Sequence, residues 1–180
     1  MRSHILRLAL AGAAMLYAGH GRAQQPAPPN PLDAVPEKMP FDIPYGSPIS
    51  LSQAQAVIAA ATAEAAKHNW KMNIAVVDSG GNLVAFARMD GAQLASVAIS
   101  EHKARVAATF RRETKAFEGA IQGGYSYVIT LDGMIGSRGG IPLVEAGKLV
   151  GAIGCSGGTG SQDEVVAKAG AAILGAAPGK

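Results

Sequence analysis

Apolar residues recur at two different spacings between Ile49 and Lys180. Three stretches place them every three or four positions, the spacing of one face of an α-helix. They are Leu51–His68 with Ser50 as its N-cap, Leu94–Phe110, and a C-terminal helix capped by Ser161 with Glu164 completing a capping box. The pattern therefore predicts three amphipathic helices.

Shorter apolar runs between these stretches predict strands. Asn73–Val77 and Leu83–Ala87 flank a Gly-rich turn, and Ile141–Glu145 and Lys148–Cys155 flank a tight turn, so each pair forms a hairpin. Tyr125–Thr130 is expected as a fifth, short extended segment. The order predicts an α+β single domain, a mostly antiparallel five-stranded sheet flanked by helices, rather than a βαβ array.

The sequence before this domain divides into two parts. Residues 1–23 combine a basic start, an apolar run of 11 residues from Leu8 to Ala18, and small residues at a cleavage position after Ala23. This is the pattern of a secretory signal peptide, which predicts a periplasmic or secreted protein with no membrane segment after cleavage. Residues 24–48 hold eight of the ten prolines, which predicts an extended N-terminal arm before the domain at 49–180.

Removing residues 1–23 changes the charge of the chain. The full sequence has 16 basic and 13 acidic residues, and three of the basic ones lie in the predicted signal peptide. The remaining chain is formally neutral, so it lacks the basic field expected of a nucleic-acid-binding protein. No nucleic-acid partner is expected.

Familiar catalytic motifs are weak in this chain. Gly154–Gly158 matches G-x-S-x-G, but a catalytic His should follow the Ser in that fold, and the last His is His102. Glycines that let a strand approach a helix explain the motif better. A single Cys, Cys155, excludes an internal disulfide and C-x-x-C-H, and two unpaired His in the mature chain give no zinc spacing.

The second predicted helix carries the most suggestive chemistry. His102 and Lys103 flank its apolar stripe, where their side chains could reach the edge of a pocket. A basic excess surrounds them: Arg88, Lys103, Arg105, Arg111, Arg112 and Lys115, offset by Glu113. This suits a ligand with carboxylates beside an apolar body, such as haem. The alternative is that these cations are ordinary surface groups or salt bridges between subunits.

Six ordered blocks resemble one known family. They are I-A-V-V-D-S-G-G-N-L-V at Ile74–Val84, R-M-D-G-A-Q at Arg88–Gln93, K-A-R at Lys103–Arg105, F-R-R-E-T-K-A-F at Phe110–Phe117, G-G-I-P-L-V at Gly139–Val144 and G-A-I-G-C-S-G-G-T at Gly151–Thr159. Together they resemble the GlcG/HbpS-like haem-degrading-domain family. The resemblance implies an antiparallel sheet flanked by helices, assembly into dimer-based homo-oligomers, and haem as cofactor. Glu113 departs from the family pattern, which usually has Pro there.

The resemblance also suggests a site. Its polar members are Arg88, Asp90, Lys103 and Thr114, which we expect to line the ligand cleft. Arg88 and Lys103 would pair with propionates, and Thr114 would offer an oxygen. His102 lies beside the K-A-R block, and its chemistry makes it the best axial metal ligand.

Three functional hypotheses follow. The first is an exported haem-binding protein that could promote oxidative haem degradation or iron release, although no catalytic constellation marks it as an enzyme. The second is a periplasmic accessory module that binds a small carboxylate or another cofactor for an oxidoreductase pathway. The third is a purely structural oligomer.

Overall fold

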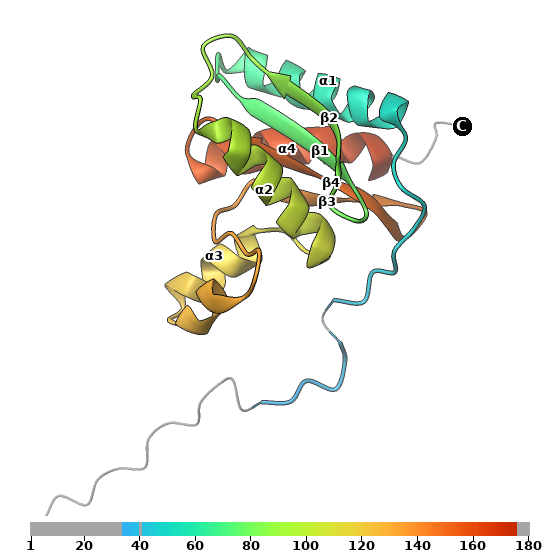
Figure 1. The fold of residues 1–180 in the computed structure, drawn as a ribbon, viewed down its shortest axis with the longest axis vertical. Coiled ribbons are helices and arrows are strands. Elements are labelled where there is room, and N and C mark those ends of the chain that lie inside the picture. The colour runs from blue at the N-terminus through green and yellow to red at the C-terminus, as the bar shows by residue number, and fades with distance from the viewer. Residues whose placement is uncertain (1–33, 40, 176–180) are drawn as a thin grey trace, which may run out of the picture. The chain divides into compact units, whose positions relative to one another are not determined.

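A computed structural model describes residues 34–39 and 41–175 (Figure 1). The predicted signal peptide and the first part of the predicted arm lie outside the described residues. The chain divides into a unit that ends at Glu37 and one that begins at Lys38, and the second holds every helix and strand of the described residues. Within the described part of the chain, no helix has the length and apolarity needed to cross a membrane.

The centre of the fold is an antiparallel sheet of four strands in the order β2-β1-β4-β3. The strands are β1 (Asn73–Asp78), β2 (Leu83–Arg88), β3 (Gly140–Glu145) and β4 (Lys148–Ser156). Side chains of β1 alternate between two covered faces, which explains why this inner strand reads as a continuous apolar run. The two predicted hairpins and the antiparallel sheet are confirmed.

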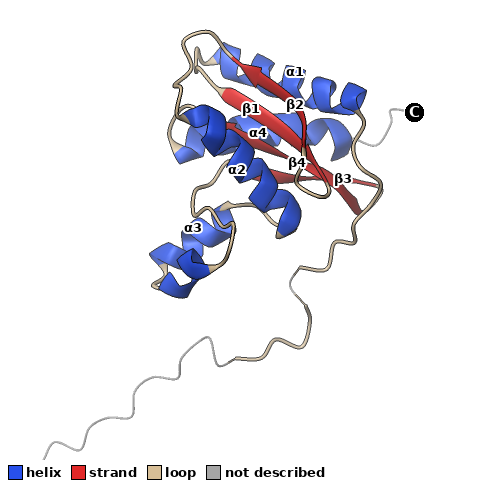
Figure 2. Cartoon of the chain, viewed as in Figure 1, coloured by secondary structure: helices blue, strands red, loops and turns tan. Residues whose placement is uncertain are grey.

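Helices cover both faces of this sheet (Figure 2). α1 (Leu51–Lys67) and α4 (Gly160–Gly175) pack on one face, where Val57 and Val166 join Ile74 and Ile153 in the main core. α2 (Ser96–Thr109) packs on the other, through Ala104, Ala107 and Ala108 against Ala75 and Ala152. Small residues on both sides of this second contact let α2 lie close to the sheet.

The prediction of a fifth strand is wrong. Residues expected to extend from Tyr125 to Thr130 instead form η2, a 3₁₀ helix over Ser126–Thr130. It follows α3 (Lys115–Gln122), a helix that the sequence pattern did not predict. Val128 of η2 packs with Phe117 of α3 and Val106 of α2 in a small separate core. Its backbone hydrogen bonds are local, as in Val128 N to Tyr125 O at 3.2 Å, so it joins no strand of the sheet.

Helix starts are partly as predicted. Ser50 caps α1 in a full capping box with Gln53. The capping box before α4 is formed by Thr159 and Gln162 instead of Ser161 and Glu164, because the helix begins at Gly160. The buried side of α2 also differs from the expected stripe. Of that stripe Val106 is fully buried, whereas Ile99 is only half-buried, and the rest of the buried side is made of Ser96, Ser100, Lys103 and alanines.

Candidate functional site

His102 lies on the side of α2 that faces the segment after η2. Its Nε2 is 2.9 Å from the carbonyl oxygen of Gly133, and its ring is half-buried. Because a carbonyl only accepts hydrogen bonds, Nε2 carries the hydrogen, and the lone pair of the neutral ring is on Nδ1. A histidine held by one nitrogen and free at the other is the usual state of a metal-binding imidazole.

An exposed apolar surface lies close to this histidine. Tyr127 is 52% exposed, Ile129 is 64% exposed and Leu131 is 38% exposed, all in η2 and the residue that follows it. Leu131 is joined to the turn that holds Gly133 by the hydrogen bond from Met134 N to Leu131 O. We call Tyr127, Ile129 and Leu131 the η2 apolar surface. Tyr127 and Ile129 are two positions apart in a helix of three residues per turn, so they point in different directions and only part of this surface can face the His102 side.

Lys103 occupies a closed environment next to His102. Its Nζ is 2.7 Å from Oδ2 of Asp163 and 3.2 Å from the carbonyl oxygen of Cys155, and the two side chains are only 2% and 3% exposed. Burial raises the pKa of Asp163, against the hydrogen bond from Lys103 that favours its ionised form. The ammonium of Lys103 is therefore engaged inside the protein, and our proposed site does not include it.

Thr114 has a similar internal role. Its Oγ1 accepts a hydrogen bond of 2.9 Å from Gly140 N, and its own N donates to Gly140 O at 3.0 Å. A side chain at Gly140 would collide with the backbone carbonyl of Lys103 and with Thr114. Thr114 and Lys103 thus meet at the first residue of β3, where they join α2 and α3 to the sheet.

Arg88 and Asp90 lie elsewhere. Arg88 is the exposed last residue of β2, and Asp90 is exposed two residues later. Because β2 and β3 are opposite edges of a four-stranded sheet, about 14 Å separates them. The structure brings Lys103 and Thr114 together at β3, sets His102 one position from Lys103, and places Arg88 and Asp90 at the other edge of the sheet.

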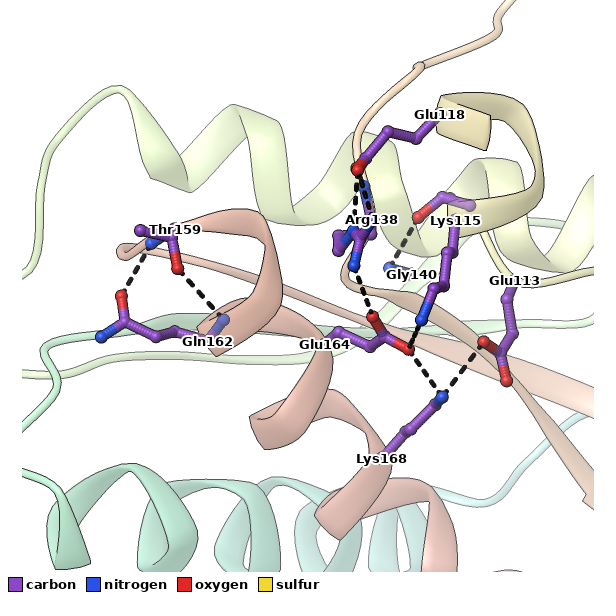
Figure 3. A network of polar contacts seen from close by, with 10 residues as sticks. Glu113, Lys115, Glu118, Arg138, Gly140, Thr159, Gln162, Glu164 and Lys168 are labelled. Atoms are coloured by element: carbon purple, nitrogen blue, oxygen red, sulfur yellow. Dashed lines mark hydrogen bonds and ion pairs between the residues drawn. The ribbon is translucent and has the colours of Figure 1, made fainter. Parts of the chain in front are cut away.

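A network of ion pairs links α3 to α4 (Figure 3). Glu164 lies 2.6 Å from Lys168, 3.1 Å from Lys115 and 3.4 Å from Arg138, and Arg138 also lies 2.6 Å from Glu118. The hydrogen bond from Arg138 holds the pKa of Glu118 below its usual value. Sequence reasoning missed this network. Its signal in the sequence was the pair of opposite charges, Lys115 and Glu118, in the first turn of the unpredicted α3.

Cys155 is fully buried between the sheet and the α1–α4 layer, and this burial raises the pKa of its thiol. The neighbouring Gly154 has no room for a side chain, because a Cβ there would collide with the backbone of Ser100 and Ala104 in α2. Gly154 of the G-x-S-x-G match therefore serves close packing of β4 against α2, as expected, whereas its second glycine, Gly158, lies against Gln162 of α4.

Residues 49–172 match the family model described as haem degrading protein HbpS-like. The chain belongs to the HbpS-like family. The match covers α1 through most of α4, so it includes the whole sheet and every residue of the proposed site. The resemblance seen in the six sequence blocks is confirmed.

Individual members agree with this assignment. Protein GlcG of Escherichia coli strain K12 is 46% identical over 108 residues, covering 60% of this chain and 81% of GlcG. The crystal structure of a double mutant of Streptomyces reticuli HbpS is 28% identical, with a TM-score of 0.68 over 79% of this chain and 98% of HbpS. The crystal structure of a PduOC–haem complex has a TM-score of 0.64 at 24% identity over 71% of this chain and 95% of PduOC, a likeness of fold.

Proposed function

We propose that this HbpS-like protein binds haem, with His102 as the iron ligand and the η2 apolar surface against the ring. The observation that carries the proposal is the match of residues 49–172 to a family described by haem degradation. The shared fold with PduOC, which was crystallised with haem, supports the capacity of this architecture for such a ligand.

The residues present fit the chemistry of haem. An imidazole nitrogen is a common axial ligand of haem iron, and the hydrogen bond to Gly133 leaves Nδ1 of His102 available. The η2 apolar surface offers exposed apolar area to a flat apolar ring. Within residues 34–39 and 41–175 no three His, Cys, Asp or Glu side chains gather into a metal cluster, so iron held by a porphyrin suits this chain better than a bare ion.

Haem, when bound, supplies a redox-active iron, and the chain supplies its holding and orientation. His102 would coordinate the iron, and the carbonyl oxygen of Gly133 orients its imidazole through a hydrogen bond. The second nearby ionisable group, Lys103, is paired with Asp163 and buried. The proposal is therefore haem binding, with any degradation left to the chemistry of the iron itself.

The test is a titration of the purified protein with hemin, followed by visible absorption, for the wild type, His102→Ala and His68→Ala. We expect saturable binding with a shifted absorption band, at least about tenfold weaker in His102→Ala. His68 is the matched control, because it is exposed on α1, paired with Glu64 and stacked on Trp70. The His68→Ala variant should bind hemin as the wild type does.

Two results would change the proposal. Saturable binding that is unchanged in His102→Ala would support haem binding and show that His102 is not the iron ligand. No saturable binding would reject haem. Thermal stabilisation by small organic acids alone would then favour the accessory carboxylate-binding module.

We also propose that binding takes place outside the cytoplasm, because residues 1–23 have the pattern of a secretory signal peptide. Expression of the full sequence followed by cell fractionation should recover the protein in the periplasm or medium, with Gln24 as its N-terminal residue. Recovery in the cytoplasm with an intact N-terminus would contradict this. Assembly into a homo-oligomer is a further part of the proposal, supported by family resemblance.

A further inference from the structure

A short segment before α1 lies against the end of α2. Pro44 O accepts a hydrogen bond of 2.9 Å from Leu149 N, and Gly46 N donates to Leu149 O at 2.7 Å. The hydroxyl of Tyr45 donates to Thr109 O at 3.0 Å. We call Phe41–Gly46 the N-terminal strap. It brings aromatic rings to the two arginines that follow α2.

Arg112 contacts one ring of the strap and one ring of α3. Its guanidinium carbon is 3.0 Å from the centroid of Phe41 and 4.9 Å from that of Phe117. Stacking of this kind covers the faces of a guanidinium and leaves its N–H groups pointing outward in the plane. Nε of Arg112 donates to Phe110 O at 3.3 Å, and its terminal nitrogens have no partner among the described residues.

Arg111 is held beside it by an unusual backbone. Its φ is +55°, in the left-handed region that is strained for a residue with a side chain. This conformation lets its side chain contact the strap as well, with the guanidinium 5.4 Å from the Tyr45 ring and one amino group donating to Ile43 O at 3.1 Å. The strained residue thus places a second guanidinium next to Arg112.

Glu113, Glu118 and Glu164, which lie just before α3, in α3 and in α4, pair with cations of the α3–α4 network. Asp42 lies in the strap between Phe41 and Ile43, the residues that contact the two arginines. Neither Arg111 nor Arg112 has a carboxylate within 4 Å in the described part of the chain. Burial lowers the pKa of Arg112, and the charge of Arg111 lowers it further. The two arginines are therefore a positive pair at the end of α2 with no ion-pair partner among the described residues, a site suited to an anion.

We propose that Arg111 and Arg112 bind the carboxylates of haem. This inference rests on the proposed function, which takes haem to be the ligand. The in-plane N–H groups of a stacked guanidinium match a carboxylate in a bidentate pair. His102 lies seven residues before the end of α2, about two turns or roughly 11 Å along the helix. Arg112 contacts the ring of Phe117, and Phe117 packs with Val128 of η2, so the arginines and η2 meet at the same small core. A ligand held at His102 could therefore extend past η2 toward the two arginines.

The test compares hemin with hemin dimethyl ester, which keeps the ring and iron but has no ionised carboxylates. Each is titrated into the wild type, Arg111→Gln, Arg112→Gln and Arg105→Gln. We expect the wild type to bind hemin about tenfold or more tightly than the ester, and this ratio to fall toward one in Arg111→Gln and Arg112→Gln. Arg105 is the matched control, an exposed arginine of α2 whose Nε donates to Gly81 O. Its variant should keep the wild-type ratio.

The outcomes separate the two proposals. Equal ratios in all four proteins would overturn the arginine site while haem binding stands. Binding of neither ligand would overturn both. Arg88→Gln is titrated in the same way, and a ratio lost in that variant alone would overturn this site and assign the carboxylates to the β2 edge. Thermal melts check that each variant is folded. If a Gln variant is unstable, Arg112→Lys replaces it, and because it keeps the charge without the planar fork, it should retain part of the preference for hemin over the ester.

Discussion

At the scale of single residues, the most informative side chain is Lys103. The sequence predicted that it lies beside the apolar stripe of a helix, at the edge of a ligand pocket. The family resemblance suggested a propionate of haem as its carboxylate partner. The structure supplies that carboxylate from within, at Asp163, 60 residues later. A buried cation needs an anion, so the need for a partner could be predicted. Which acid it would be depends on where α4 begins relative to α2, and no local pattern encodes that.

Breaking this pair should be costly. Lys103→Met leaves Asp163 buried without its cation, and we expect the free energy of unfolding to fall by about 3–5 kcal/mol at pH 7. Adding Asp163→Asn should recover part of the loss, because the buried charge is gone. Chemical denaturation of the two variants and the wild type measures this.

The pH dependence distinguishes charge from packing in the same variants. Burial raises the pKa of Asp163, so its ionisation opposes folding, and the penalty is present above its folded pKa and relieved as the pH falls. Lys103→Met should therefore recover stability relative to the wild type as the pH is lowered from 7 toward 5. An unchanged difference across this range would mean that the lost stability comes from packing alone.

At the scale of elements, the segment from α3 to η2 is where sequence and structure differ most. The helices and hairpins that pack on the main core have long periodic patterns, and all were predicted. α3 has eight residues, and its apolar positions serve a small core shared with Val106 and Val128. Short elements of this kind are defined by contacts with distant residues, so periodicity within a few residues could not identify them.

Gly119 offers a direct test of the assignment of α3. It lies inside the helix, and a Cβ there would meet nothing within 4 Å. Gly119→Ala should raise the free energy of unfolding by up to about 1 kcal/mol, because alanine restricts the unfolded chain and favours helix. A loss of stability in denaturation experiments would argue against a helix there. Gly140→Ala is the contrasting variant and should be strongly destabilising, because its Cβ would lie 2.6 Å from Thr114 Cγ2.

The α3–α4 network should make the protein sensitive to acid. The pKa of Glu118 lies below its usual 4.5 because Arg138 donates a hydrogen bond to it, and the pKa of Glu164 is also lowered, by its lysine partners acting against burial. A carboxyl group with a lowered folded pKa stabilises the fold above about pH 4.5, and this contribution is lost as the pH falls through the folded pKa. Unfolding measured from pH 7 to pH 3 should show this decline. Glu118→Gln should be less stable at pH 7 and decline less steeply.

At the scale of the whole molecule, the domain extends further toward the N-terminus than its pattern suggests. Both the predicted boundary and the family match begin at residue 49, yet the strap from Phe41 to Gly46 is hydrogen-bonded to β4 and α2. Proline-rich composition predicted an arm at these residues. It contained no information on what the backbone would contact, because carbonyls and aromatic rings bind surfaces that form only after folding.

Truncation tests the role of the strap. A chain that begins at Ser47 loses the hydrogen bonds of Pro44, Tyr45 and Gly46 and the stacking of Phe41, and we expect it to lose about 2 kcal/mol of stability after the regained chain entropy is counted. A chain that begins at Lys38 keeps these contacts and should be as stable as the full sequence. Equal thermal stability of the two truncated chains would show that the strap contributes nothing to the fold.

The burial of Cys155 has a practical consequence. A thiol reagent can reach this only cysteine of the chain when β4 separates from α1 and α4, so the labelling rate of the native protein reports how often the centre of the sheet opens. A ligand that binds only the closed form slows this opening in proportion to its occupancy. The unmodified protein therefore carries its own binding sensor, which needs no chromophore and responds equally to hemin, its ester and a colourless organic acid.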